Sequence, residues 1–181
     1  MTTTDGVFSG RLLVVAFEGW NDAGDAASSA VRTLQEQLEV FALHSCDSET
    51  YYDFQFNRPT IGFDDTGNRV LTWPTSTIFA PLVPGTIAPS IADDADLGVT
   101  GDNTANIYLL QGVEPSRNWQ TFTGEVLDVA LAADISGIIV LGAMLADVPH
   151  TRPIHTFLSS DNAQVRSEFG VERSSYEGPV G

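Results

Sequence analysis

The feature that most constrains the fold is an apolar run at residues 11–17, RLLVVAF, which leads directly into the polar segment EGWND. A short, partly β-branched run of this kind is typical of a strand that is buried on both faces of a sheet. From Ala23 to about Leu38 the apolar residues recur with helical spacing, and Asp22 or Asn21 can cap this helix by accepting a hydrogen bond from a backbone N–H. The sequence therefore predicts a strand, a polar loop and a helix.

Two further apolar runs predict two more core strands, NIYLLQ at residues 106–111 and GIIVL at residues 137–141. Between them, Pro115 suits the first turn of a helix whose apolar stripe extends to about Ala133. This alternation of strands and helices predicts a three-layer α/β/α sandwich with a mostly parallel central sheet. A chain of 181 residues is long enough for one such core, so we expect residues 1–181 to form a single domain.

A β-rich insertion is expected between the first helix and the second core strand. Short strands are predicted at residues 40–43, 51–56, 69–73 and 76–79. The turn sequence DDTGN at residues 64–68 indicates a hairpin, and residues 81–105 predict a long loop because they show little periodicity.

After the third core strand, the sequence predicts one more strand and one short helix. The strand is expected at residues 154–158, and the helix from a cap at Asp161 to about Phe169, where Gly170 ends it.

The chain has a formal net charge of −16, from 24 acidic and 8 basic residues, with a local density at Asp93, Asp94 and Asp96. Such a charge repels phosphates and anionic lipid surfaces, so neither nucleic acid nor a membrane is an expected partner. No apolar run approaches the ~20 residues that cross a bilayer, and the N-terminus lacks the features of a signal peptide. We therefore expect a cytoplasmic protein.

Polar residues follow each of the three core strands, and parallel strands would bring these loops to one edge of the sheet. The candidate residues for a pocket or an interface there are Glu18, Trp20, Asn21, Asp22, Asp25, Asn57, Arg58, Glu114, Arg117, Asp147, His150 and Arg152. They have two interpretations. Carboxylates for acid–base chemistry and arginines for an anion would make a ligand pocket. Alternatively, ion pairs and hydrogen bonds among them would fix the loops or join subunits.

No motif singles out a reaction. The sequence has no GxGxxG, no P-loop and no GxSxG elbow. The histidines His44, His150 and His155 lack the spacing of a metal site, and Cys46 is expected to be a half-buried small residue. We therefore predict no catalytic residue, metal ion or cofactor, and favour a protein that is not an enzyme.

Several long strings resemble the proteasome assembly chaperone 2 family, and its actinobacterial members in particular: VVAFEGWNDAGDAAS, YDFQFNRP, LTWPT, GVEPSRNW, LGAMLADVPHTRP and YEGPVG. The resemblance implies a fold similar to that of purine nucleoside phosphorylases, and self-association, with trimers among the expected forms. It supplies no catalytic residues. The eukaryotic relatives chaperone assembly of the proteasome α-ring, which is a protein-binding function.

Family members continue beyond the string YEGPVG, so this chain is expected to lack the C-terminal part of the family's full length. The hydrophobic–tyrosine–any-residue tail by which some relatives dock on the proteasome is not visible. The expected function is that of a non-enzymatic, chaperone-like homo-oligomer, with other proteins as further candidate partners. The alternative is a nucleoside- or phosphate-type small-molecule binding protein or enzyme that uses the crevice at the strand ends.

Overall fold

The structure is a computed structural model that describes residues 10–82, 106–149 and 151–178. It contains two compact units. Residues Gly10–Met144 form the larger unit, which holds the central sheet, and the described residues from Leu145 onward form the smaller one. Each unit is described by itself, and the single domain expected over residues 1–181 stays a prediction.

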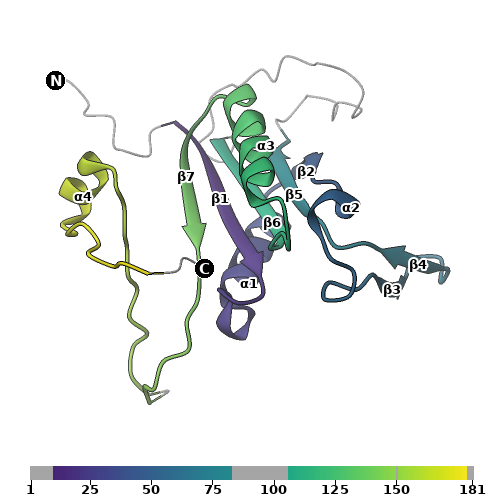
Figure 1. The fold of residues 1–181 in the computed structure, drawn as a ribbon, viewed down its shortest axis with the longest axis horizontal. Helices are drawn as coiled ribbons and strands as arrows, with labels where there is room; N and C mark the ends of the chain where they lie inside the picture. The colour runs from purple at the N-terminus through teal and green to yellow at the C-terminus, as the bar shows by residue number, and fades with distance from the viewer. Residues whose placement is uncertain (1–9, 83–105, 150, 179–181) are drawn as a thin grey trace. The chain divides into compact units, whose positions relative to one another are not determined.

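The larger unit begins with the predicted strand, loop and helix and then enters the insertion (Figure 1). Its elements are, in chain order, β1 (Arg11–Glu18), η1 (Ala23–Asp25), α1 (Ala26–Gln37), β2 (Val40–Ser45), α2 (Ser48–Tyr51), β3 (Thr60–Phe63), β4 (Arg69–Thr72), β5 (Ser76–Pro81), β6 (Ile107–Val113), α3 (Trp119–Ala132) and β7 (Ile135–Leu141). The smaller unit contains the helix α4 (Ala163–Phe169).

The central sheet has five strands in the order β2-β5-β6-β1-β7. β1 pairs in parallel with both β6 and β7, whereas β5 is antiparallel to both β6 and β2. Four of the five strands therefore run in one direction, which confirms the predicted mostly parallel sheet. β3 and β4 form a separate two-stranded sheet.

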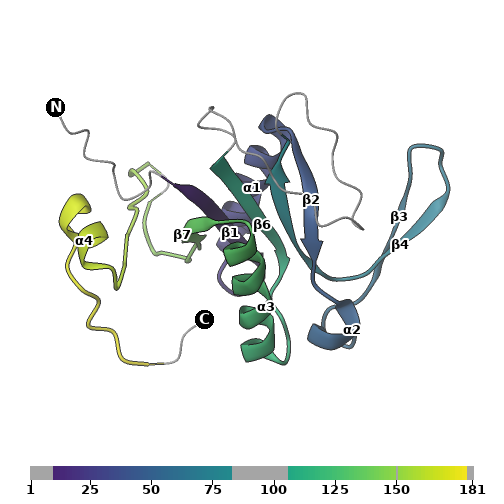
Figure 2. The same cartoon turned by 90° about the horizontal axis from the view of Figure 1, so that it is seen from above.

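The two faces of the sheet are covered by different helices, as Figures 1 and 2 show. Leu13 and Val15 of β1 belong to a buried cluster against which Val126 and Val129 of α3 pack. Ala16, the residue after Val15, points the other way and is buried with residues of α1 on the opposite face. Successive side chains of a strand point to opposite faces, so one apolar strand supplies both cores. This arrangement confirms the α/β/α layers.

Asp22 caps α1 although it lies four residues before the first residue of the helix. Its Oδ1 atom accepts hydrogen bonds from the backbone N–H of Ala27 at 2.6 Å and of Ser28 at 3.3 Å. The predicted cap is therefore present, but α1 begins at Ala26 rather than Ala23. The reason is local backbone conformation, because Gly24 and Asp25 have positive φ angles of 68° and 55°, which interrupt the helix.

The predicted strand at residues 51–56 is wrong. The Asp47 side chain accepts a hydrogen bond from the Thr50 N–H at 2.7 Å, and this cap makes Ser48–Tyr51 a short helix. Tyr51 and Tyr52 are buried as core aromatics rather than as alternating strand residues. The turn and the returning arm of the predicted hairpin are confirmed, but the returning arm β4 pairs with β3.

Three smaller expectations near the helices also need correction. Pro115 precedes α3 by four residues, since Asn118 has a φ of 56° and the helix begins only after it. Residues 154–158 form no strand, because they are exposed and pair with no other described strand. Asn162, not Asp161, caps α4, because its Oδ1 atom accepts from the N–H groups of Gln164 and Val165. The Gly170 stop is confirmed, with a φ of 64°.

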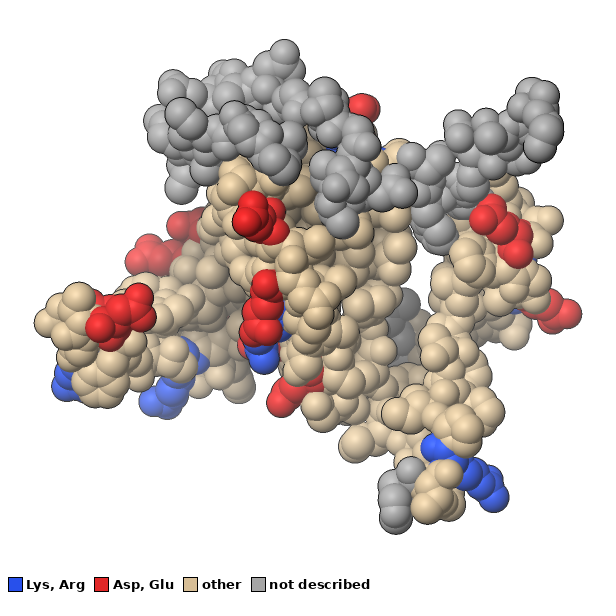
Figure 3. All heavy atoms as spheres, turned by 180° about the vertical axis from the view of Figure 1, so that it is seen from behind, with Lys and Arg blue, Asp and Glu red and all other residues tan. Residues whose placement is uncertain are grey.

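Acidic side chains occur at several separate places on the face that Figure 3 shows, rather than as one patch. The acidic residues Asp93, Asp94 and Asp96 lie outside the described residues, as does most of the predicted loop. Within the described parts of the chain, no helix combines the length and apolar character needed to span a bilayer.

We predict that Asp22→Ala lowers the free energy of unfolding by about 1–2 kcal/mol, because two buried N–H groups at the start of α1 lose their acceptor. Urea unfolding followed by circular dichroism measures this loss. Asp25→Asn is the matched control. Asp25 is exposed and its side chain makes no cap hydrogen bond, so this variant should keep wild-type stability. Equal losses in the two variants would contradict the assigned cap.

The same carboxylate makes stability depend on pH. Burial raises the pKa of Asp22, but hydrogen bonds from Ser28 and Ala27 and the charge of Arg32 outweigh burial and lower the pKa below its ordinary value of 3.8. The stabilisation is therefore present above that value and is lost as the pH falls through the lower pKa of the folded state. Asp22→Asn should flatten this acid limb of the stability–pH curve.

We also predict that Gly112→Ala lowers the free energy of unfolding by about 1–3 kcal/mol. A Cβ atom at Gly112 would lie 2.2 Å from the backbone oxygen of Thr75 and 2.5 Å from the Cα atom of Ser76, so the β5–β6 pairing must shift. Gly62→Ala is the control, since a Cβ at Gly62 meets no atom within 4 Å. Unfolding curves of the two variants should differ, and coinciding curves would refute the close approach.

Candidate functional site

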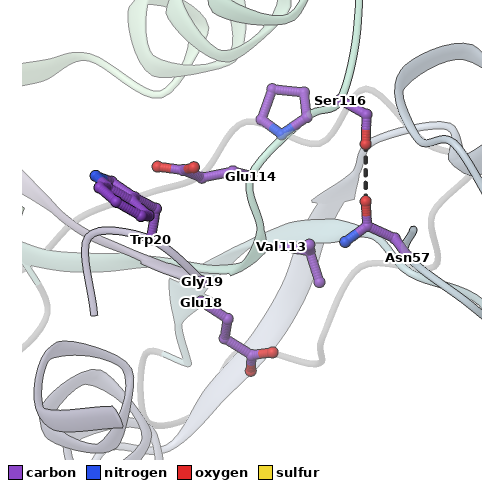
Figure 4. A pocket seen from close by; sticks show the side chains of 8 residues that line it. Glu18, Gly19, Trp20, Asn57, Val113, Glu114 and Ser116 are labelled. Carbon is purple, nitrogen blue, oxygen red and sulfur yellow. Dashed lines mark hydrogen bonds between the residues drawn. The ribbon is translucent and has the colours of Figure 1, made fainter. Parts of the chain in front are cut away.

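An open pocket of about 530 Å³ lies where β1 and β6 end. Its walls come from the β1 end, the loop after α2 and the β6 end, as Figure 4 shows. The lining residues are Glu18, Gly19, Trp20, Asn57, Val113, Glu114, Pro115 and Ser116. Four of the predicted candidates, Glu18, Trp20, Asn57 and Glu114, are thus brought together here.

The position of this pocket follows from the strand register. Glu18 is paired with Val113, so the parallel strands β1 and β6 end level with each other. The chain then leaves each strand directly into a polar loop. This is the edge at which open α/β sheets bind their ligands, outside the carboxyl ends of the strands.

The pocket is acidic and open to solvent. Glu18 and Glu114 contribute carboxylates, and Glu18 forms a 3.6 Å ion pair with Arg32. Trp20 is 89% exposed, so its ring is available for stacking. Ser116 donates a hydrogen bond to Asn57 at 2.7 Å, which fixes one wall (Figure 4). These groups suit a cationic or uncharged polar ligand better than a phosphate, which two carboxylates would repel.

Asn21 and Asp22 join the ends of β1 and β7 instead of lining the pocket. The Asn21 carbonyl accepts a hydrogen bond from Ala143 N–H at 2.9 Å, and Ala23 N–H donates to the Ala143 carbonyl at 3.0 Å. Asp22 is only 4% exposed and caps α1. Both residues therefore hold the strand-end loops in place.

Arg117 also holds a loop in place rather than lining the pocket. Its guanidinium donates from Nε to the Thr50 carbonyl at 3.2 Å and from Nη2 to the Glu49 carbonyl. Asn118 donates to the Thr50 carbonyl as well, at 2.9 Å. These donors satisfy carbonyls at the end of α2, so the loop after β6 ties α2 to the sheet edge.

The remaining candidates do not line this pocket or do not belong to the larger unit. Asp25 and Arg58 are exposed in the larger unit. Asp147 and Arg152 are exposed in the smaller unit, and His150 lies outside the described residues. The convergence of these last three residues with the pocket stays a prediction.

Sequence reasoning missed a second polar group, made by His44, Tyr51 and Glu125. His44 Nε2 lies 2.6 Å from Glu125 Oε1, and the Tyr51 hydroxyl donates to Glu125 Oε2. The Cys46 sulfur lies beside them, within 4.8 Å of a ring nitrogen of His44 and of a carboxylate oxygen of Glu125. His44 and Cys46 are two residues apart and so share a side of an extended chain, but nothing in the sequence links them to Glu125.

The charge of Glu125 shifts the pKa values around it. Burial alone would raise the pKa of Glu125, but hydrogen bonds from Tyr51 and His44 outweigh it and lower that pKa. Burial, followed by the Glu125 charge, raises the pKa of Cys46 to about 12. The hydrogen bond to Glu125, followed by burial, raises the pKa of Tyr51 to about 12. Glu125 is therefore the carboxylate at neutral pH, and the thiol and phenol keep their protons.

Comparison with known proteins places this fold among solved actinobacterial structures. The chain is 39% identical to a PAC2 family protein from Streptomyces avermitilis, with a TM-score of 0.71 over 94% of this chain and 65% of that one. It is equally 39% identical, with a TM-score of 0.71 and the same coverage, to a proteasome-assembly chaperone homologue from Mycobacterium tuberculosis. A third structure, a protein of unknown function from M. tuberculosis, is 27% identical with a TM-score of 0.70, over 94% of this chain and 53% of that one.

The chain thus spans about two thirds of the length of the first two structures. No curated protein matches it. The model of the PAC2 family matches residues 16–181, which is nearly the whole sequence. On this match, the chain belongs to the PAC2 family.

Proposed function

We propose that this protein is a non-enzymatic, assembly-chaperone-like interaction protein that works in the cytoplasm as a homo-oligomer, with a trimer as the expected form. Family membership supports a protein-binding role, since one relative at 39% identity is named a proteasome-assembly chaperone homologue. This chain spans 65% of that relative, so its partner is part of the proposal.

The observation that carries the proposal is the exposed apolar face of the β3–β4 hairpin. Ile61 is paired with Leu71 and Phe63 with Arg69, so these four side chains lie on one face of the ribbon. Ile61, Phe63 and Leu71 are 58%, 73% and 50% exposed. The hairpin extends away from the central sheet in both Figure 1 and Figure 2.

Such a hairpin needs a partner surface. An isolated two-stranded ribbon is at best marginally stable in water. Within the larger unit its base is held by Trp73, whose ring centroid lies 4.8 Å from that of Phe54. Large apolar side chains gathered on one exposed face mark an interaction site. Burial of this face against protein would stabilise the hairpin and remove the apolar area from water.

Charge favours a second copy of the chain as the occupant. Residues 57–73 hold Arg58 and Arg69 against Asp64 and Asp65, which sum to zero, whereas the whole chain carries −16. Two acidic bodies repel each other, but a neutral apolar arm approaches an acidic body without that cost. An arm that contacts a different surface on the next copy makes a head-to-tail interface, which closes into a ring such as a trimer.

We predict that Phe63→Asp and Leu71→Asp shift the oligomer to smaller species. A buried Phe or Leu contributes about 1.5–3 kcal/mol, so each substitution should weaken association at least tenfold. Analytical ultracentrifugation over a range of concentrations measures the change. The folded monomer should keep its circular dichroism spectrum, since both side chains are exposed.

The matched control is Val70→Asp, which adds the same charge to the same hairpin but on its opposite face. It should keep the wild-type oligomer. A wild-type protein that stays monomeric at all concentrations would refute the proposal. So would an equal loss of association in all three variants, because the effect would then come from charge rather than from the apolar face.

A second function, small-molecule binding, is favoured by the pocket at the ends of β1 and β6. Its volume of about 530 Å³ falls in the range of ligand sites. A nucleoside-type ligand fits the exposed ring of Trp20 and the hydrogen-bonding groups of Glu18 and Glu114. This role agrees with the phosphorylase-like fold that the resemblance implies, although the carboxylates disfavour a phosphate.

If this pocket binds a nucleoside, adenosine should raise the melting temperature and inorganic phosphate should not, because a ligand that prefers the folded state stabilises it. Trp20→Ala should weaken adenosine binding at least about fivefold, since stacking of a base contributes about 1–3 kcal/mol. Trp20→Phe keeps an aromatic face and should retain most of the affinity. Isothermal titration calorimetry separates the variants, and equal affinity in both would exclude the pocket.

A further inference from the structure

Three different metal-ligating side chains meet between the end of β2 and helix α3, away from the residues that line the strand-end pocket. They are His44 of β2, Cys46 just beyond β2, and Glu125 of α3. One ligand atom from each, an imidazole nitrogen, a thiol sulfur and a carboxylate oxygen, lies within 4.8 Å of the other two. In the part of the chain that the structure describes, this is the group whose geometry could hold an ion.

A β-bulge in β2 creates the cluster. Ala42 pairs with Phe79 and His44 with Ile78, so Leu43 is the extra residue between two pairs. In an unbulged strand His44 would point to the face opposite α3. The inserted residue instead places His44 beside Ile78, on the face that packs against α3. A bulge that redirects one polar side chain is a recurring feature of functional sites.

Cys46 comes to the same side two residues later. Its backbone N–H donates to the Ser76 carbonyl at 2.9 Å, which continues the pairing with β5. The side chain is 3% exposed and packs with Tyr51 and Phe122. Glu125 is one turn beyond Phe122 on α3, so the helix directs its carboxylate toward the same place.

The donor set fits zinc. Zn²⁺ is bound by histidine nitrogen, cysteine sulfur and carboxylate oxygen, with bonds of about 2.0–2.3 Å. Tetrahedral bonds of this length set donor atoms about 3.3–3.6 Å apart. The 2.6 Å separation of His44 Nε2 and Glu125 Oε1 would have to open by about 1 Å or less, and the sulfur, within 4.8 Å of both atoms, would have to approach by at most about 1.5 Å. Side-chain rotation covers such shifts.

The surroundings also suit an ion. The side chains of His44 and Glu125 are 33% and 29% exposed, which leaves solvent access for a fourth ligand such as water. Tyr51 donates a hydrogen bond to the Glu125 oxygen that His44 does not contact, and so orients the carboxylate from behind. A cation would also neutralise Glu125 and favour the thiolate of Cys46, because a coordinating thiol loses its proton.

We propose that His44, Cys46 and Glu125 form a three-residue binding site for a zinc-class divalent cation, with water as the fourth ligand. Such an ion clamps the end of β2 to α3 and, through Tyr51, to α2. The competing interpretation is a hydrogen-bonded network in which His44, Tyr51 and the protonated thiol of Cys46 surround Glu125. The thiol distinguishes the two interpretations, since only a metal ion makes Cys46 a thiolate ligand.

The experiment uses the whole chain, stripped of metal with a chelator and then titrated with Co²⁺ as a spectroscopic substitute for zinc. A cobalt–thiolate bond absorbs by charge transfer in the near ultraviolet, and this chain has one cysteine. We expect that band to saturate at one Co²⁺ per chain and to be displaced by Zn²⁺. Absence of the band in the folded wild-type protein would overturn the proposal without any variant.

Variants then assign the ligands. Cys46→Ser should abolish the charge-transfer band. His44→Ala should weaken Zn²⁺ binding by at least about 100-fold, because the loss of a residue that only hydrogen-bonds to a metal ligand already lowers metal affinity by about 10–100-fold. Tyr51→Phe should weaken binding about tenfold while the band persists. His155→Ala is the control, because His155 is exposed in the smaller unit, and it should bind as the wild type does.

Melting temperature supplies a second readout. Zn²⁺ should raise it in the wild type and in His155→Ala but not in Cys46→Ser, whereas the same concentration of Mg²⁺ should have no such effect. An equal rise with Zn²⁺ and Mg²⁺, or an equal rise in Cys46→Ser, would show that the ions bind to surface carboxylates and would refute the site.

Discussion

The rest of the structure depends on β1, which is hydrogen-bonded in parallel to β6 on one side and to β7 on the other. Its backbone groups are therefore satisfied by two neighbours, and its apolar side chains serve the cores beneath both α1 and α3. Because all three strands run the same way, their polar loops leave at one edge. The pocket exists there, and the Asp22–Ala143 bridge closes the same edge on the β7 side.

The other half of the sheet follows a different constraint. β5 runs against its neighbours, which returns β2 to the common direction and brings its bulge under α3. The short α2 segment connects this half to the pocket. The Tyr51 carbonyl accepts a hydrogen bond from the N–H of Ser116, which lines the pocket, and the Tyr51 hydroxyl donates to Glu125. One residue therefore contacts both polar sites.

The β3–β4 hairpin differs in net charge from the rest of the chain. The chain as a whole is strongly acidic, which keeps copies apart, while the hairpin is neutral and presents apolar side chains. The proposed association through the hairpin would bury apolar area without setting two acidic surfaces directly against each other. This separation of roles is consistent with a protein whose work is contact with other proteins.

Local pattern by itself determined the strands β1, β6 and β7, the helices α1 and α3, the layers and the family, because apolar periodicity and long family strings are properties of consecutive residues. The local pattern gave a wrong strand at residues 51–56, because the Asp47 cap stabilises a short helix that ends at Tyr51. Glu18 and Glu114 could be placed at one edge from sequence, since parallel strands align their ends. The meeting of His44 with Glu125 could not, because the two residues are 81 positions apart and a one-residue bulge decides which face His44 occupies. Only the tertiary structure sets that register, through the packing of α3 on the sheet.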